Sequence, residues 1–316
     1  MVYEKFLKTI NTSLQEKLND SYQLTVLRIP KNNGKILDGI SIQRIGEQMA
    51  PTVYLNSYYE SFEDGTMTLT QILDDILRLL NCNLAPTTIN VEQISDFSFV
   101  KDKIMFKVIH AKSNKALLAD LPHLTTLDLA IIFYLFLERN ESGQMTALIH
   151  HEHKKLWNVS EKELMELALV NTPAAFPANI KNMMEVMKEI AKEQLGDDYN
   201  EGIMNILLKS DEPPAPLYVL SNQVGLNGAG CILYPDALKN FANSLGRDLI
   251  ILPSSIHEVL ITPDNTEMSY ENFAEMVTSI NQNEVPPEDQ LSNQVYLYQR
   301  ADERLRIVSH SVSLVG

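Results

Sequence analysis

The sequence predicts an α+β fold, with a small N-terminal helix/three-strand/helix unit followed by a larger mixed α+β domain. Two observations favour this class. Segments with apolar residues at helical spacing and segments with strand-like alternation both recur along the chain, and the second half ends in a β-α-β-β-α-β-β order. At 316 residues the chain is long enough for two ordinary domains, which we expect at 1–95 and 96–316.

The small unit is predicted to begin with a helix and a hairpin. Residues 2–18 form one apolar helix face from side chains four positions apart: Phe6, Ile10, Leu14 and Leu18. Residues 22–29 and 39–45 alternate and are rich in β-forming residues. The segment 31–35 between them contains two asparagines and a glycine, which is typical of a tight connection.

The rest of the small unit is predicted to be a third strand with its helical cover. Residues 51–55 indicate the strand, and 56–62 and 68–80 indicate helices, the second of which Thr68 can cap. A small sheet needs such helices to cover its apolar face. Residues 83–96 contain a proline and few periodic apolar residues, so the boundary between the domains is expected there.

The larger domain is predicted to open with two strongly apolar segments, 103–109 and 127–137. Both fit central strands, but 127–137 is also long enough for a buried helix, and periodicity does not decide between the two. Ser160 and Glu163 form a capping box that begins a helix through residue 169. Further strands are expected at 145–150, 217–220, 231–234, 248–252, 258–262, 295–300 and 304–308, and further helices at 179–195, 201–208, 235–245 and 269–280. The proline-rich run 211–216 predicts a rigid turn or, alternatively, an interdomain linker.

The net charge of −15 is concentrated in the second half of the chain. Residues 1–158 hold 16 Lys and Arg against 18 Asp and Glu, whereas residues 159–316 hold 10 against 23. Such acidity repels phosphate backbones, so direct nucleic-acid binding is not expected. The acidity permits a basic protein partner or mimicry of a nucleic acid. It equally fits an ordinary solvated surface that keeps the protein in solution.

The sequence favours a cytoplasmic protein with no membrane segment. Residues 1–8 lack the apolar core of a signal peptide, and no 18 apolar residues run together. Cys82 and Cys231 lie far apart and form no C-x-x-C pair, so we expect two buried thiols and neither a disulfide framework nor a cysteine-based zinc site. Nothing in the sequence indicates a cofactor.

Several segments resemble a known family. They are TVYLNSYYESFEDGTMTLTQIL (52–73), LPHLTTLDLAIIF (121–133), LWNVSEKELMELALVNTP (156–173) and GAGCILYPDALKNFANSLGRDLIILPSSIHEVLI (228–261). The chain is similar, from about residue 50 to 308, to a bacterial family that is common in anaerobic gut bacteria and classed only as a domain of unknown function. The resemblance implies a bacterial, cytosolic origin and carries no activity, cofactor or catalytic residue.

The histidine cluster at 150–153 contains possible metal ligands, namely His150, His151 and His153. Their spacing does not favour a metal site. On a strand only His151 and His153 share a face, and on a helix only His150 and His153 are suitably spaced. The metalloprotease pattern H-E-x-x-H is absent, because Lys155 stands where its second histidine would be. We therefore interpret the cluster as a surface feature that leads into a helix.

The segment between two predicted strands, Pro253 to Glu258, holds the residue types of a nucleophile, its base and its orienting group: Ser254, Ser255, His257 and Glu258. Adjacent residues seldom converge as a triad, and the G-x-S-x-G elbow is missing. The ordinary interpretation is a turn in which a serine bonds backbone amides and His257 packs or hydrogen bonds.

A glycine-rich segment at 222–230 contains Gly225, Gly228 and Gly230. It matches neither a Walker loop nor G-x-G-x-x-G. The glycines indicate a backbone that bends sharply or approaches something closely, which fits a ligand loop and a plain turn between strands alike.

Two hypotheses of function follow. The favoured one is a non-enzymatic interaction or regulatory protein, because the second half is acidic and no active-site pattern is recognisable. The alternative is a hydrolase-like enzyme whose site joins the 225–230 loop to the 254–258 turn. These two segments would face each other if their flanking strands share a sheet. Whether the chain is an enzyme is left undecided.

Overall fold

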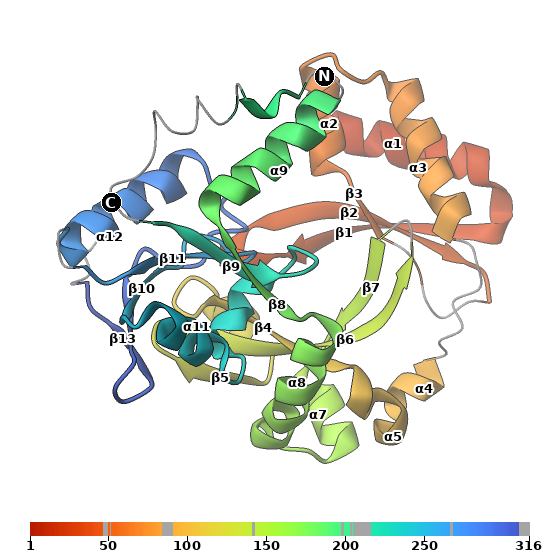
Figure 1. The fold of residues 1–316 in the computed structure, drawn as a ribbon. Helices are drawn as coiled ribbons and strands as arrows, with labels where there is room; N and C mark the ends of the chain where they lie inside the picture. The colour runs from red at the N-terminus through yellow and green to blue at the C-terminus, as the bar shows by residue number, and fades with distance from the viewer. Residues whose placement is uncertain are drawn as a thin grey trace.

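The computed structural model describes residues 1–46, 50, 52–83, 91–140, 143–196, 199–202, 204, 216–265 and 268–309. In these residues, three antiparallel sheets and the helices around them form the mixed α+β fold that the sequence predicts (Figure 1). Among the described residues, none of the helices combines the length and the apolar character that crossing a membrane requires.

The N-terminal sheet has the order β1-β2-β3, with the bounds Tyr22–Pro30, Ile36–Arg44 and Thr52–Tyr54. Helices α1 (Tyr3–Leu18), α2 (Asn56–Glu63) and α3 (Leu69–Asn83) pack with it around one core, which includes Phe6, Ile10, Leu14, Ile40, Ile42, Leu55, Ile72 and Ile76 (Figure 1). The predicted hairpin is confirmed. Its strands pair from Tyr22 opposite Arg44 to Pro30 opposite Ile36, and a single 3-10 turn, η2 (Asn32–Gly34), joins them.

Residues 127–137, for which the sequence left a strand and a buried helix open, lie mostly in a strand of the second sheet. Strand β6 (Leu129–Asn140) pairs on one side with β4 (Ile104–His110) and on the other with β5 (His123–Thr126) and β7 (Gly143–Leu148). Alternate side chains of β6 enter cores on both faces of the sheet, which is why residues 129–137 are all apolar. The turn before it places Leu127 at a positive φ of 54°.

The third sheet has the order β13-β12-β10-β11-β9-β8 and is antiparallel throughout. Its strands, in that order, are Arg304–Ile307, Tyr296–Gln299, Leu249–Leu252, Val259–Pro263, Tyr218–Asn222 and Ala178–Asn182. Helix α12 (Tyr270–Asn283) covers one face, where it meets Ile250, Leu252 and Leu297. The other face contributes Leu249, Ile251 and Ile261 to the largest core.

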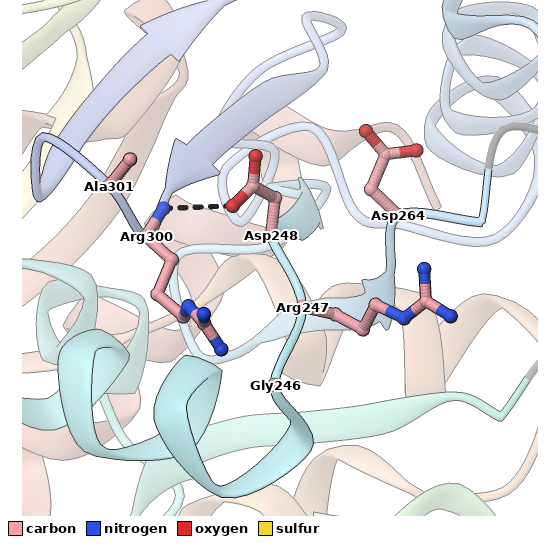
Figure 2. Close-up of a pocket in the computed structure, with 6 residues that line it drawn as sticks. All are labelled: Gly246, Arg247, Asp248, Asp264, Arg300 and Ala301. Carbon is pink, nitrogen blue, oxygen red and sulfur yellow. Dashed lines mark hydrogen bonds between the residues drawn. The ribbon is translucent and has the colours of Figure 1, made fainter.

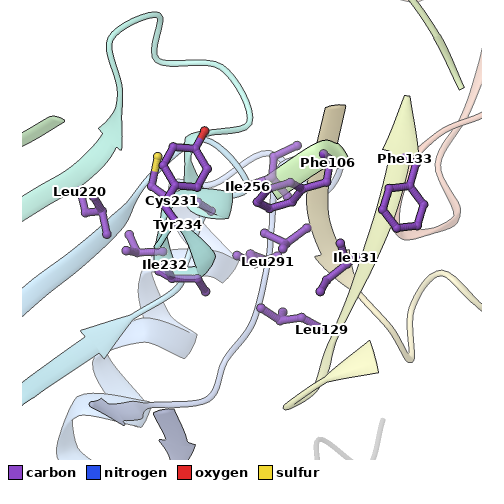
Figure 3. Close-up of a cluster of buried hydrophobic side chains, with 14 of the residues drawn as sticks. Phe106, Leu129, Ile131, Phe133, Leu220, Cys231, Ile232, Tyr234, Ile256 and Leu291 are labelled. Carbon is purple, nitrogen blue, oxygen red and sulfur yellow. The ribbon is translucent and has the colours of Figure 1, made fainter. Parts of the chain in front are cut away.

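That largest core lies between the second and third sheets. A 3-10 segment, η5 (Gly228–Leu233), fills the space between them. Figure 3 shows Cys231, Ile232 and Tyr234 on one side of this core and Phe106, Ile131 and Phe133, from the second sheet, on the other. Helices α7 (His151–Trp157), α8 (Glu161–Ala175) and α11 (Ala237–Leu245) add Trp157, Leu164, Ala168, Leu238 and Ala242. The capping box predicted at Ser160 and Glu163 is confirmed at the start of α8.

Two predicted elements are wrong. Residues 231–234 were expected as a strand, but they belong mostly to η5, because the glycines before them let the chain coil into the core instead of joining a sheet edge. Residues 179–195 were expected as one helix. The chain forms β8 over Ala178–Asn182, where Ile180 pairs with Leu220, and only then α9 (Met183–Leu195), which Asn182 caps.

The structure also contains elements that the periodicity of the sequence did not predict. Four short helices or strands were not predicted: α4 (Val91–Ser95), α5 (Phe97–Val100), α6 (Lys115–Leu118) and β5. They are too short for a periodic pattern to emerge. The predicted helix at 201–208 and the turn at 211–216 lie largely outside the described residues.

The tip of the β1–β2 hairpin joins the N-terminal unit to the rest of the protein. The side-chain amide of Asn33 donates to the carbonyl oxygens of Pro287 (2.8 Å) and Gln290 (2.7 Å), and its oxygen accepts from Asn114 (2.9 Å). Lys35 forms an ion pair with Glu288 at 2.6 Å. The division into domains at 95/96 stays a prediction.

Candidate functional site

The two loops that the hydrolase hypothesis pairs do meet. Strands β9 and β11 are neighbours, and the turn at 254–258 lies against the glycine-rich loop that follows β9. The backbone amide of Ala229 donates to the carbonyl of Ile256 (3.2 Å), and the Ser221 hydroxyl donates to the carbonyl of His257 (2.7 Å). A third loop, residues 286–290, joins them through the amide of Ile256 and the carbonyl of Asp289 (2.8 Å).

His257 connects these three loops through both of its ring nitrogens. Nδ1 accepts the backbone amide of Asn227 (3.2 Å), and Nε2 lies 3.2 Å from Oδ1 of Asp289. Because Nδ1 is the acceptor, the proton of the neutral ring is on Nε2 and points to the carboxylate. Both nitrogens are thus engaged by the protein itself.

The serines of this turn hydrogen bond to backbone groups. The Ser255 hydroxyl accepts the amide of His257 (3.0 Å), and Ser255 forms an isolated bridge with Gln290. The carbonyl of Ser254 accepts from the amide of Leu291 (2.9 Å). A nucleophilic serine must give its proton to a free ring nitrogen. In the described residues the ring nitrogens of His257 are engaged by Asn227 and Asp289, whereas Glu258 stands partly exposed before β11.

The three glycines of the loop have different surroundings. Gly225 sits at a positive φ of 70°, with open space where a Cβ would be. Gly228 is enclosed, since a Cβ would meet the Ser221 hydroxyl at 2.1 Å and the His257 carbonyl oxygen at 2.5 Å. Gly230 would place a Cβ 3.3 Å from the Phe106 ring. The close approach that glycine permits is therefore, at Gly228 and Gly230, an approach to the protein's own chain.

A second polar group, which sequence reasoning missed, links the second and third sheets. Asp128 accepts hydrogen bonds from the hydroxyls of Ser292 (2.6 Å) and Tyr296 (2.5 Å), and its carboxylate lies 3.8 Å from Nε2 of His110. Burial, with Asp128 beside it, holds the pKa of Tyr296 well above its usual value. The carboxylate is the centre of the group and the serine donates to it, so this is a partly buried hydrogen-bond network rather than a nucleophile with its base.

The histidine cluster surrounds the start of α7. His150 Nδ1 lies 2.6 Å from Oδ2 of Asp120, and His153 Nδ1 accepts the backbone amide of His150 (3.0 Å) to complete a capping box. The ring of His153 stacks on Trp157. In the part of the chain that the structure describes, no three His, Cys, Asp or Glu side chains come together in a way that could hold a metal ion.

We expect His153 to give the protein a small pH dependence of stability. Burial first, and then the nearby His150, lower the pKa of His153, while Glu152 and Asp120 oppose the shift. A lowered pKa means that the unfolded chain binds the proton first, so stability is lost as the pH falls below about 6.5. We expect His153→Gln, which can keep the capping box, to reduce this loss by no more than about 1 kcal/mol. Urea unfolding at pH 7.5 and pH 5 measures it. Identical pH profiles for the two proteins would contradict the assignment.

A shallow pocket of about 300 Å³ lies at one end of the inner strands β10, β11 and β12 of the third sheet, where α11 ends and β10 begins (Figure 2). It is lined by Gly246, Arg247, Asp248, Asp264, Arg300 and Ala301. Figure 2 shows the two guanidinium groups pointing in different directions, and the carboxylate of Asp248 accepting the backbone amide of Arg300 (2.9 Å). Two cations and two carboxylates balance in this pocket, so it has no charge preference for a ligand.

The fold is mixed α+β, and the polar side chains described above, such as His257 and Asp128, connect its loops and sheets by hydrogen bonds. The chain belongs to a family of unknown function, DUF5688, which it matches over residues 3–300. Neither a curated protein nor a solved structure matches it. The membership agrees with the resemblance seen in the sequence, whereas the bacterial origin stays a prediction.

Proposed function

We propose that the protein is a non-enzymatic interaction or regulatory protein of the bacterial cytoplasm that binds a basic protein partner through helix α9. The observation that carries the proposal is the exposed apolar stripe of this helix. None of the residues of α9 is buried, and Met187, Ile190 and Leu195 keep 42%, 48% and 47% of their surface exposed. An amphipathic helix with its apolar face uncovered is a common element of partner recognition.

Charge supports a basic partner. Glu185, Glu189 and Glu193 recur every four residues and form a row along α9 beside the apolar stripe. Only Glu189 has an ion pair among the described residues, with Lys181 at 2.6 Å. The helix lies in the half of the chain that carries most of the net negative charge. A partner segment with apolar side chains flanked by lysine or arginine would therefore fit this surface.

The hydrolase-like alternative lacks comparable support. Its loops at 225–230 and 254–258 meet, but the ring of His257 is occupied by Asn227 and Asp289, and the Ser255 hydroxyl by a backbone amide. These bonds are sufficient to explain why serine and histidine stand in this turn.

The test is capture of partners from the native cell on immobilised protein. We expect a protein that binds at about 0.05 M salt and elutes at about 0.5 M, because screening weakens contacts between exposed charges. The variant Met187→Ser/Ile190→Ser should capture at most about a tenth of the partner protein that the wild type captures, since both substitutions remove apolar contact area. The matched control Leu156→Ser/Val170→Ser, which removes apolar side chains exposed by 60% and 69% elsewhere, should bind normally.

Either of two results would overturn the proposal. The first is that no protein binds at low salt above the level of an unrelated acidic protein. The second is that binding is equal for wild type and the α9 variant, or equally reduced in the control. Circular dichroism of both variants verifies that the substitutions left the fold intact.

A further inference from the structure

Strand β1 forms one edge of the N-terminal sheet, because among the described residues β2 is the only strand that pairs with it. The pairing runs from one end of β1 to the other without a shift of register, so this edge is long and regular. Residues 25–28 are all exposed. Val26 and Leu27 point to opposite faces of the sheet, and they keep 41% and 39% of their surface exposed. The described part of the chain thus leaves the middle of the edge uncovered.

The hydrogen bonds around β1 show which of its backbone groups face outward. In an antiparallel pair, residues that exchange hydrogen bonds alternate with residues that do not. The amide of Lys31 donates to the carbonyl of Lys35 (2.7 Å), so the odd-numbered residues of β1 bond to β2. Asp38 stands opposite Arg28, and its carbonyl accepts instead from the amide of Leu55 (2.8 Å), on the side of β2 away from β1. The even-numbered residues of β1 therefore direct their backbone groups away from β2.

Three of these outward-facing residues have backbone groups that can accept another strand. At Tyr22 the outward carbonyl accepts from the side-chain amide of Gln15 on α1 (3.3 Å). At Leu24, Val26 and Arg28 the outward N–H and C=O groups have no hydrogen-bond partner in the part of the chain that the structure describes. Donors and acceptors thus alternate along one line, which is the arrangement that a further β-strand recognises.

Strand β1 also lacks the features by which proteins keep exposed edges apart. It contains no lysine, its register has no bulge, and its proline, Pro30, stands at its last position. Arg28 is the only charged residue of the strand and lies 3.8 Å from Asp38 of the neighbouring strand. A regular edge with exposed apolar side chains is typical of an interaction surface.

We propose that β1 pairs with β1 of a second copy of this chain, antiparallel and about a two-fold axis at Val26. In this register Val26 lies opposite Val26 of the other copy, and Leu24 lies opposite Arg28. Each copy contributes three outward N–H groups, at Leu24, Val26 and Arg28, so six hydrogen bonds form. The two three-stranded N-terminal sheets become one sheet of six strands.

A second copy is the occupant because β1 is complementary to itself in this register. Moving the axis one residue toward the C-terminus would require an N–H group from Pro30, which has none, and would bring the two Arg28 side chains together. Moving it one residue toward the N-terminus would require the carbonyl of Tyr22, which Gln15 already occupies. An axis at Val26 avoids both conflicts.

Charge permits this pairing and favours no oppositely charged partner. Residues 1–158, which include β1, hold 16 Lys and Arg against 18 Asp and Glu, so this half of the chain is nearly neutral. With the axis at Val26, the two Arg28 side chains stand four residues apart along the sheet, or about 14 Å, which is beyond the screening length of about 8 Å at physiological salt. The surface is separate from the acidic helix α9.

The test is the molar mass of the full chain in solution, measured by sedimentation equilibrium at about 0.15 M salt. An interface of one strand from each copy is small, so we expect association at micromolar concentrations. Between about 1 and 100 μM protein the mass should therefore rise from that of one chain toward that of two.

Variants at the axis locate the contact. Val26→Lys places two ammonium groups opposite each other, and Val26→Pro removes an outward N–H group while the bonds from β1 to β2 remain. Each should raise the dissociation constant of the dimer at least about tenfold. Val170→Lys, at a valine on α8 that is 69% exposed, is the matched control and should dimerise like the wild type. The α9 variant Met187→Ser/Ile190→Ser should do so too. Circular dichroism verifies that each variant is folded.

Cross-linking tests the register. It uses a Cys82→Ser background, in which the remaining Cys231 is fully buried. On oxidation Val26→Cys should give a covalent dimer, because the two Cα atoms would lie about 5.5 Å apart, within the span of a disulfide. Leu27→Cys should give at most about a tenth as much, since Leu27 lies opposite Thr25 and only diagonal to its own counterpart, at about 7–8 Å.

A wild type that keeps the mass of one chain at the highest concentration overturns the proposal and leaves the edge to an extended segment of a different protein. A dimer that persists in both Val26 variants, or that the α9 variant loses, would lie elsewhere on the surface and overturns it as well. Equal cross-linking at positions 26 and 27 would refute the register and with it the two-fold axis at Val26.

Discussion

Gly228→Ala is expected to destabilise the protein by about 3 kcal/mol, the upper end of what an added methyl group costs in a packed interior. The new Cβ would lie 2.1 Å from the Ser221 hydroxyl, 2.5 Å from the carbonyl oxygen of His257 and 2.7 Å from the amide nitrogen of Asn222. Two of these atoms belong to the backbone of neighbouring strands and loops. Relief of the clash therefore has to separate η5 from β9 or from the 254–258 turn.

The measurement is the free energy of unfolding from urea titration, with Gly230→Ala as the matched control. A Cβ at Gly230 would meet only the Phe106 ring at 3.3 Å, and a side chain can yield where backbone cannot. The control should cost about 1 kcal/mol. Equal costs at the two positions would show that the tight packing around Gly228 relaxes freely, contrary to the expectation.

The fold was predictable where a local pattern sufficed. The β1–β2 hairpin was marked by its alternation and its asparagine–glycine turn, and α8 by the capping box at Ser160 and Glu163. The segment 231–234 was not predictable from pattern. Its apolar residues fit a strand as well as a buried 3-10 turn, and only the space between two sheets, known from the whole fold, decides for the turn.

For the polar sites too, a local sequence pattern did not reveal the contacts made between distant segments. That the 225–230 loop meets the 254–258 turn followed from two neighbouring strands, and the structure has them adjacent. The carboxylate beside His257 belongs to Asp289, on a third loop that no local pattern connects to it.

A substitution at the hairpin tip, where the N-terminal unit contacts the larger part of the protein, is the second that we expect to lower stability strongly. Asn33→Asp should cost about 3 kcal/mol, because it replaces an amide that donates to the carbonyls of Pro287 and Gln290 by an oxygen that repels both. Asn114, which donates to the Asn33 oxygen at 2.9 Å, is almost fully buried with 1% of its surface exposed. The damage is therefore concentrated where the hairpin tip meets the larger part of the protein.

Asn33→Gly is the matched control, because glycine accepts the positive φ of 57° at this position and removes the side-chain bonds without adding a charge. We expect this substitution to cost about 1–2 kcal/mol of unfolding free energy.

Two spectroscopic probes distinguish the two units during unfolding. Trp157 is the sole tryptophan and lies in the largest core, so its fluorescence follows the larger part of the protein, while circular dichroism follows every helix. In Asn33→Asp the dichroism should begin to change at lower urea than the fluorescence, whereas in the wild type the two should coincide. Coincident transitions in the aspartate variant, or a cost no larger than that of glycine, would mean that the hairpin tip does not couple the two units. Loss of dichroism at lower urea than the fluorescence in the aspartate variant would instead place the main connection between the two units at this turn.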